Sequence, residues 1–203
     1  MRVISIDVDT ENREVMLSIE GMSAYTIMQS DFGPLDIAEG DDIDEQIAEE
    51  IIYFDEKLRC VKQAFKHLSY ADCSSGRLSK KLLQKFSQRA SAETVQLLVD
   101  HGYLRDAELC AEYARNNYEI KRHGPIRIRR DLYNLGFASE IVSEVLEEYE
   151  SMDHSENLEF VLSSRFRSRD PQNRQKAFAM LYRLGYPYDD VREAVENYFE
   201  SEL

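Results

Sequence analysis

Apolar residues recur at intervals of three or four along most of this 203-residue chain, which is the period of an amphipathic helix. The longest of these stripes predicts one long helix, or two helices joined near Asp55. Asp42, with Glu45 three residues later, can form a capping box at its start. The stripe consists of Ile43, Ile47, Ile51, Phe54, Leu58, Val61, Phe65 and Leu68. Such a stripe is typical of a helix face that packs on a core.

The chain before this stripe is rich in strand-forming residues instead. Three runs of β-branched and aromatic residues are separated by TENRE and EGMS, a pattern that predicts an antiparallel sheet. The runs contain Val3, Ile4, Ile6 and Val8, then Val15, Leu17 and Ile19, then Ala24, Tyr25, Ile27 and Phe32. The fold class that we expect is therefore mainly α, preceded by a small N-terminal antiparallel β-sheet.

A repeat is visible in the helical part. The triplets LGF, with Gly136, and LGY, with Gly185, each lie between two helical patterns, and the glycines are 49 residues apart (185 − 136). A period of this size predicts tandem three-helix repeats stacked in an elongated, curved array. The expected parts are a β-rich part at 1–42, a connecting helix at 43–54 and repeats at 55–104, 105–152 and 153–203. The first repeat is the least regular, with a break at 74–76 and the segment 89–91 in place of the glycine turn.

The segment 101–137 contains the most distinctive pattern. We expect a helix over about 106–119, a break at His123 and Gly124, and a second helix that starts at Pro125. The buried face of the second helix should be Ile128, Leu132 and Leu135. Gly136 should end this helix in the left-handed conformation, and Phe137 should fold back onto Leu132.

Five cations lie within ten positions of this segment, with no acid among them, in a chain whose net charge is −14. They are Lys121, Arg122, Arg127, Arg129 and Arg130. Arg127 and Arg130 share a helix face and lie near the positive end of the helix dipole, so local electrostatics disfavours both. The cluster is either a solvated face whose arginine stems cover apolar neighbours or a binding site for carboxylates or phosphates.

Two motifs in this segment resemble the RecX family of RecA regulators. GYLRDAEL resembles the GYLDD-like turn of that family, and HGPIRIRRDLYNLGF resembles its G-P-x-R-I-R-x-x-L-x-x-K-G stretch. The matching residues are Gly102, Tyr103, Leu104 and Asp106, then Gly124, Pro125, Arg127, Ile128, Arg129, Leu132 and Gly136. Arg105 stands where the family has an acid, and Leu135 where it usually has a lysine. The resemblance is specific here and extends loosely from about residue 36 to the C-terminus.

The resemblance implies a regulatory protein, not an enzyme, that acts in DNA repair, homologous recombination and the SOS response. It would bind RecA or the RecA–DNA filament, contact DNA through the filament, and inhibit recombinase and ATPase activity by occupying the filament groove and blocking extension. The expected RecA- or DNA-binding residues are Lys121, Arg122, Arg127, Arg129, Arg130 and Tyr133. Secondary basic patches on the other repeats comprise Arg77, Lys80, Lys81 and Lys85, and Arg165, Arg167, Arg169, Arg174 and Lys176.

An alternative function is a stand-alone module that binds single-stranded nucleic acid, with Tyr118 and Tyr133 contacting bases. Charge argues against it in part. Residues 1–57 contain 16 acidic and three basic residues, a net charge of −13, while the remainder carries −1. The acidic part opposes binding to a polyanion.

Composition and motif spacing bound the remaining possibilities. No apolar run approaches the roughly 18 to 20 residues of a membrane span, and acids stand where a signal peptide would be apolar. Three cysteines without metal-binding spacing fit a reduced cytoplasmic compartment. Asp7 and Asp9 resemble a DxDxT phosphohydrolase motif, but Glu11 stands in place of the threonine. We therefore expect a cytoplasmic monomer with no catalytic site, no metal, no cofactor and no small-molecule substrate.

Overall fold

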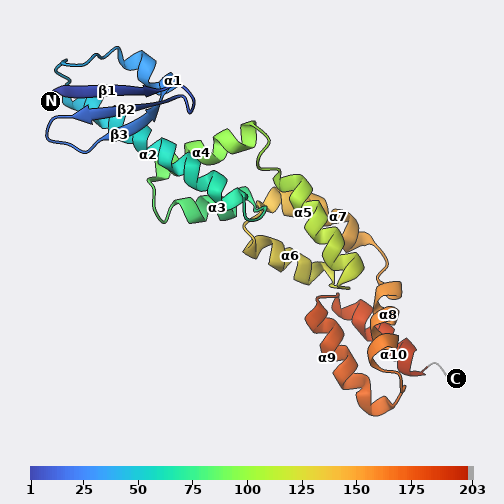
Figure 1. Cartoon of the computed structure of the whole chain (residues 1–203). Helices are drawn as coiled ribbons and strands as arrows, with labels where there is room; N and C mark the ends of the chain where they lie inside the picture. Colours follow the sequence, from blue (N-terminus) through green and yellow to red (C-terminus); the bar gives the residue numbers. More distant parts are fainter. Residues whose placement is uncertain (201–203) are drawn as a thin grey trace. The chain divides into compact units, whose positions relative to one another are not determined.

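The computed structural model describes residues 1–200, and the chain divides into two compact units. The first unit comprises residues 1–72 and 78–103, and the second comprises residues 73–77 and the chain from Leu104 onward. The fold is mainly helical, with one small antiparallel sheet at the N-terminus (Figure 1). Among residues 1–200, no helix is both long enough and apolar enough to cross a membrane.

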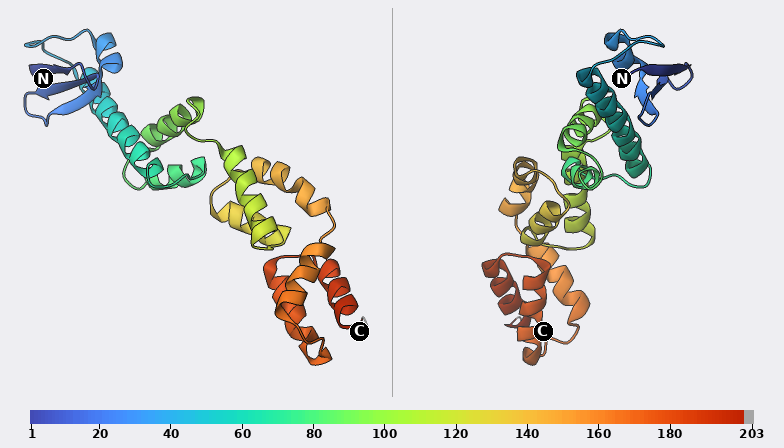
Figure 2. Two further views of the ribbon diagram at one scale, coloured as in Figure 1. Left: turned by 45° about the vertical axis from the view of Figure 1, so that its right-hand side comes forward. Right: turned by 90° about the vertical axis from the view of Figure 1, so that its left-hand side faces the viewer.

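The sheet of the first unit is a three-stranded meander. Strands β1 (Val3–Asp9), β2 (Glu14–Ile19) and β3 (Tyr25–Met28) pair in sequence order, all antiparallel. Alternate residues of β2 are buried, and helix α2 (Glu45–Leu68) lies against the sheet (Figures 1 and 2). The predicted sheet is confirmed, although its third run ends early. Phe32, which we expected in that run, ends the short helix α1 (Gln29–Phe32).

Carboxylates from elsewhere in the unit cover both outer strands of the sheet. The backbone N–H of Ile6 in β1 donates to Glu39 Oε1 at 2.8 Å, and that of Thr26 in β3 donates to Asp55 Oδ1 at 2.9 Å. An open strand edge offers unpaired donors to another chain, so these bonds protect the sheet against pairing with other molecules. Two acids of the strongly negative N-terminal part therefore have a structural role.

Helix α2 is continuous through Asp55, so the choice between one helix and two is resolved in favour of one. The predicted cap is wrong by two residues. Asp44 is the N-cap and accepts from the Ile47 N–H at 2.9 Å, whereas Asp42 bridges to Arg2. Asp41, Asp42 and Asp44 lie close together, and the hydrophobic pattern does not show which of them adopts the extended backbone conformation that an N-cap requires.

Two further helices complete the first unit, namely α3 (Ser75–Leu82), whose first residues belong to the second unit, and α4 (Gln88–Asp100). Helix α4 packs on α2, and its N-cap Ser87 donates two hydrogen bonds to the Glu56 carboxylate. The segment 89–91, which we expected to replace the glycine turn of the repeat, lies inside α4 instead. The turn between α3 and α4 falls at residues 83–86.

The second unit contains the helices α5 to α10 around one continuous apolar core. The helices are α5 (Asp106–Arg115) with a π-helical turn (Asn116–Ile120), α6 (Pro125–Asn134), α7 (Ser139–Ser151), α8 (Ser155–Arg165), α9 (Arg174–Leu184) and α10 (Tyr188–Glu200). A 3₁₀ turn (Pro171–Asn173) precedes α9. The starts of α5 and α6 agree with the sequence prediction, and Ile128 and Leu132 are fully buried as expected.

Two glycine contacts join helix ends in this unit. Gly136 (φ +86°) ends α6 with a pair of hydrogen bonds, from its own N–H to Tyr133 O and from the Phe137 N–H to Leu132 O. Gly185 (φ +89°) ends α9 in the same left-handed conformation. A Cβ atom on Gly124, at the start of α6, would collide with the carbonyl of Gly185.

The start of α6 is held against the end of α9 by backbone hydrogen bonds. The N–H of Gly124 donates to Leu184 O at 2.8 Å, and that of Ile126 donates to Gly185 O at 3.1 Å. The first N–H groups of a helix and its last carbonyls have no partners within their own helix, so each end here satisfies the other. The same contact recurs at the start of α3, where a Cβ on Gly76 would collide with the Gly136 carbonyl.

We expect Gly124→Ala to lower the free energy of unfolding by at least about 2 kcal/mol, because overpacking of a tight contact typically costs that much. Gly124 has a negative φ (−77°), so the added methyl group tests the close approach without left-handed strain. The matched control is Gly21→Ala, because Gly21 has φ +77° and no atom among the described residues lies within 4 Å of the point that its Cβ would occupy. It should cost about 1 kcal/mol from strain alone. Urea unfolding followed by circular dichroism measures both, and a smaller cost for Gly124→Ala than for Gly21→Ala would contradict the contact.

Candidate interaction surface on α6

The outward face of α6 combines one cation with two exposed apolar side chains. Ile126, Arg130 and Tyr133 stand at i, i+4 and i+7, so they share one side of the helix. Ile126 is 56% exposed, Tyr133 42%, and the Arg130 side chain 67%. Ile128 and Leu132 on the opposite side anchor the helix in the core of the second unit. The helix therefore presents a guanidinium between an aliphatic and an aromatic group.

Arg129 is fixed by a carboxylate from the neighbouring helix. Its Nε and Nη2 donate to Glu150 Oε1 of α7 at 2.9 and 2.7 Å, and its Nη1 donates to the Tyr133 hydroxyl at 3.3 Å. The hydrogen bond to Glu150 raises the pKa of Arg129. A second ligand for this guanidinium would have to displace Glu150, so Arg129 serves mainly to join α6 to α7 and to orient Tyr133.

Arg127 and Arg130 share the carboxylate of Asp131. Their Nε atoms lie 3.6 and 3.7 Å from its two oxygens. The Arg127 side chain is half as exposed as that of Arg130, and Arg127 Cβ and its backbone N pack against Gly185. Arg127 is therefore partly a packing residue at the helix-end contact, while Arg130 remains open to solvent.

These contacts correct the view of the cluster as five cations without counter-charges. Asp131 lies directly after the ten-residue window, four positions from Arg127, and Glu150 lies on α7. The dipole cost is also reduced, because the C-terminal carbonyls of α9 lie against the N-terminus of α6. Local and tertiary contacts thus stabilise much of the cluster.

Arg122 belongs to a polar network inside the second unit. It takes a left-handed conformation (φ +54°), its Nη1 donates to Asn157 Oδ1, and its guanidinium lies 4.8 Å from the centre of the Phe160 ring. Its carbonyl accepts from the buried Tyr186 hydroxyl at 3.1 Å. Lys121 lies near the Tyr113 ring and donates to Asn117 Oδ1 at 3.4 Å. Arg122 therefore links the end of α5 to α8 and to the turn after α9.

Tyr118 does not present its ring for contact with a base, as the nucleic-acid alternative requires. It is 8% exposed, and its hydroxyl lies 2.9 Å from Nδ1 of His154, whose side chain is 1% exposed. Burial lowers the pKa of His154, against the smaller opposing effects of Asp190 and Asp153. No sequence pattern indicates this pair, because the two residues are far apart in the chain.

The secondary basic residues fall partly on equivalent helices, because α3 and α9 are the second helices of the first and third predicted repeats and both contain members of this group. Arg77 belongs to the second unit, whereas Lys80, Lys81 and Lys85 belong to the first. In the third predicted repeat, Arg174 and Lys176 lie on α9, and Arg174 pairs with Glu200 at 2.7 Å. The others, Arg165, Arg167 and Arg169, lie at the end of α8 and in the segment after it. These three arginines therefore lie outside the second helix of the third predicted repeat.

The fold is mainly helical, and the candidate surface is a helix face on which an exposed cation, Arg130, lies beside an exposed aromatic ring, Tyr133. No model of a known protein family matches the chain. Regulatory protein RecX from Bacillus mycoides (strain KBAB4) is 28% identical over 177 residues, which cover 85% of this chain and 66% of that protein. The chain thus spans just under two thirds of the length of that curated relative.

Solved structures match the chain in fold. A crystal structure of regulatory protein RecX superposes with a TM-score of 0.74 at 18% identity, covering 97% of this chain and 98% of that one. A crystal structure of RecX from Lactobacillus salivarius gives a TM-score of 0.61 at 20% identity, covering 71% of this chain and 97% of that one. Together, the relatives and the fold support a RecX family protein.

The buried His154 predicts a pH dependence of stability. Its pKa is lowered in the fold, so below the unfolded value of about 6.5 the unfolded chain takes up a proton that the folded protein resists. Stability should therefore fall as the pH decreases from 7.5 to 5.5. His154→Gln should make this fall shallower without abolishing it, because burial also lowers the pKa of His67 and His123. Urea unfolding at each pH measures the slope, with His101→Gln as an exposed-histidine control. An unchanged slope in His154→Gln would contradict the assignment.

Proposed function

We propose that this protein regulates the RecA recombinase. In this proposal it binds RecA, or the RecA filament on DNA, in the cytoplasm, and it inhibits recombination and ATP hydrolysis by occupying the filament groove and blocking extension. It acts as a monomer without a cofactor and carries out no reaction of its own. The observation that carries the proposal is the similarity to RecX proteins, in sequence over 85% of the chain and in fold over 97%.

The outward face of α6 is the surface that we assign to this contact. Among residues 1–200, Arg130 forms one ion pair, with Asp131 at 3.7 Å, and its own side chain is 67% exposed; ion pairs of exposed side chains contribute little to stability. A carboxylate of RecA or a phosphate of filament-bound DNA can therefore replace Asp131 at small cost. Ile126 and Tyr133 flank the guanidinium and add apolar area, and arginine and tyrosine are residue types that are enriched at binding hot spots.

The remaining cations of the cluster have supporting roles in this proposal. Arg129 is bound to Glu150 and positions Tyr133, Arg127 packs against Gly185, and Arg122 holds the polar network. Their contribution to RecA binding is to keep α6 in place. The secondary patches remain candidate contacts of lower weight, because they are dispersed over two units and several elements.

Arg130→Ala should weaken suppression of the DNA-stimulated ATPase activity of RecA at least tenfold, or about 1.4 kcal/mol. The melting temperature should change little, because the lost ion pair is exposed. The matched control is Arg105→Ala, since the Arg105 side chain is 68% exposed and forms a similar local ion pair with Glu108. It should leave suppression unchanged. Equal effects of the two variants would contradict the assignment of α6, and no suppression by the wild type would contradict the function.

Binding to naked DNA distinguishes the alternative, a stand-alone single-strand binder that uses Arg130 and the exposed Tyr133. Under that alternative, the wild type binds single-stranded DNA tightly at physiological salt. Loss of Arg130 would then flatten the dependence of log K on log salt by about 0.7. We expect weak binding instead, because the 1–57 segment carries a charge of −13. Tight binding to naked DNA without contact to RecA would favour the alternative.

A further inference from the structure

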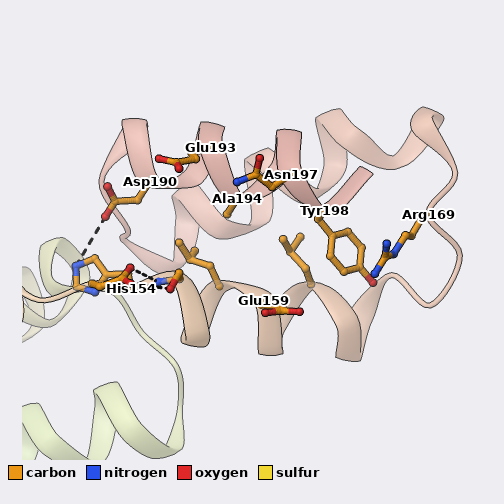
Figure 3. Close-up of a pocket in the computed structure, with 12 residues that line it drawn as sticks. His154, Glu159, Arg169, Asp190, Glu193, Ala194, Asn197 and Tyr198 are labelled. Atoms are coloured by element: carbon orange, nitrogen blue, oxygen red, sulfur yellow. Dashed lines mark hydrogen bonds and ion pairs between the residues drawn. The ribbon is translucent and has the colours of Figure 1, made fainter. Parts of the chain in front are cut away.

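A cavity of about 410 Å³ lies in the second unit, with lining residues from α8, α10 and the segments next to them (Figure 3). This volume is within the range of small-molecule sites, about 300 to 1,000 Å³. Leu158 and Leu162 of α8 and Ala194 of α10 give it an apolar middle. None of its lining residues belongs to α6, so its role can be tested separately from the proposed RecA contact.

The two ends of the cavity differ in charge. His154, Asp190 and Glu193 lie toward one end, Arg169 and Tyr198 lie toward the other, and Glu159 lies between them (Figure 3). Asp153, the chain neighbour of His154, also contributes to the lining. The guanidinium of Arg169 lies 4.9 Å from the centre of the Tyr198 ring. A ligand with one cationic group would therefore place it at the His154 end, away from Arg169.

One buried polar atom at the acidic end lacks a hydrogen bond. The His154 side chain is 1% exposed, and among the described residues its Nε2 atom has no hydrogen-bond partner. Nε2 faces Asp190, whose Oδ2 is 3.9 Å away, too far for a hydrogen bond (Figure 3). A buried ring nitrogen without such a partner has lost its hydration without compensation.

We propose that this cavity binds a primary ammonium carried on an unbranched alkyl chain, such as the end of a lysine side chain. The alkyl chain would lie along Leu158 and Leu162. The ammonium group would lie between His154 Nε2 and Asp190 Oδ2, and at their 3.9 Å separation a nitrogen can approach both to about 2.9 Å.

The protonation of His154 is compatible with this arrangement. If the ring carries its hydrogen on Nδ1 and donates it to the Tyr118 hydroxyl, Nε2 offers a lone pair to the ligand. Burial lowers the pKa of His154, which favours the neutral ring that can accept a hydrogen bond. An ammonium has three N–H donors, which can donate to His154 Nε2, to the Asp190 carboxylate and to the carboxylate of Glu193, which also lines this end.

Other ligand classes fit less well. At the end that holds the unpaired His154 Nε2, an anion would meet the carboxylates of Asp153, Asp190 and Glu193. In the part of the chain that the structure describes, no three His, Cys, Asp or Glu side chains are arranged to hold a metal ion. A guanidinium prefers two parallel oxygens of one carboxylate, whereas the acceptors here are a ring nitrogen of His154 and an oxygen of Asp190, which belong to two different side chains.

The test uses the whole chain labelled with ¹⁵N and followed by NMR. The probe is lysine blocked at both backbone ends, and the matched probe is blocked norleucine, which has the same straight chain without the ammonium. We expect blocked lysine to shift the His154 ring resonances and the Asp190 amide, and blocked norleucine to shift them much less. Absence of shifts with blocked lysine, or equal shifts with norleucine, would overturn the proposal.

Two variants localise the binding. Asp190→Asn should weaken binding of blocked lysine at least fivefold, and it should fold normally because Asp190 is 39% exposed. Glu196→Gln removes the same charge from an exposed position of α10 outside the lining and should leave the affinity unchanged. Equal weakening by both variants would show a general charge effect and would overturn the site.

A third probe identifies the source of the ammonium. If 1,5-diaminopentane binds more tightly than blocked lysine and Asp190→Asn weakens both, the ligand is a free diamine. If blocked lysine binds at least as tightly, the cavity receives a lysine side chain of a partner protein. Either result supports an alkylammonium site, while binding of the diamine that Asp190→Asn does not affect would contradict it.

Discussion

The second unit depends on the contact between the start of α6 and the end of α9. The N–H groups of Gly124 and Ile126 have carbonyl partners in Leu184 and Gly185, and both glycines are required because a Cβ on either one would collide with the other helix end. This contact places α6, buries Ile128 and Leu132, and sets which residues of α6 face outward. The proposed RecA-binding surface is therefore a product of helix-end geometry as much as of arginine content.

Charge on α6 is organised by acids that lie outside the cluster. Glu150 fixes Arg129, and Asp131 is shared by Arg127 and Arg130. The guanidinium groups therefore differ in how firmly they are held. Arg129 forms short hydrogen bonds to Glu150, whereas Arg130 can exchange its ion pair with Asp131 for an external anion. A dense basic sequence thus becomes a surface with one main exposed contact, flanked by apolar groups that add specificity.

Much of the fold follows from the sequence, because period-two and period-3.6 patterns identified the sheet, the long helix α2 and the start of α6. The errors have physical causes. Asp42 and Asp44 are equally good caps in sequence, and the backbone conformation selects Asp44. The salt bridge of Arg129 to Glu150, the pairing of Tyr118 with His154 and the cavity beside α8 depend on tertiary packing, for which local periodicity carries no signal. The ion pair between Arg127 and Asp131 could have been predicted from the sequence, since the two residues are four positions apart, the spacing at which helical side chains meet.

The carboxylates that cover the outer strands give the N-terminal sheet a built-in limit to its growth. A further strand could pair beside Ile6 or Thr26 only if it displaced the carboxylate of Glu39 or Asp55. Such a displacement is unfavourable, because a hydrogen bond from a backbone N–H to a charged carboxylate is stronger than one to a neutral carbonyl. At high local concentration, copies of this protein therefore have a barrier to edge-to-edge fibril formation that needs no extra domain. Two acidic residues of the N-terminal segment, Glu39 and Asp55, thus favour solubility, because they occupy backbone N–H donors at the edges of the sheet.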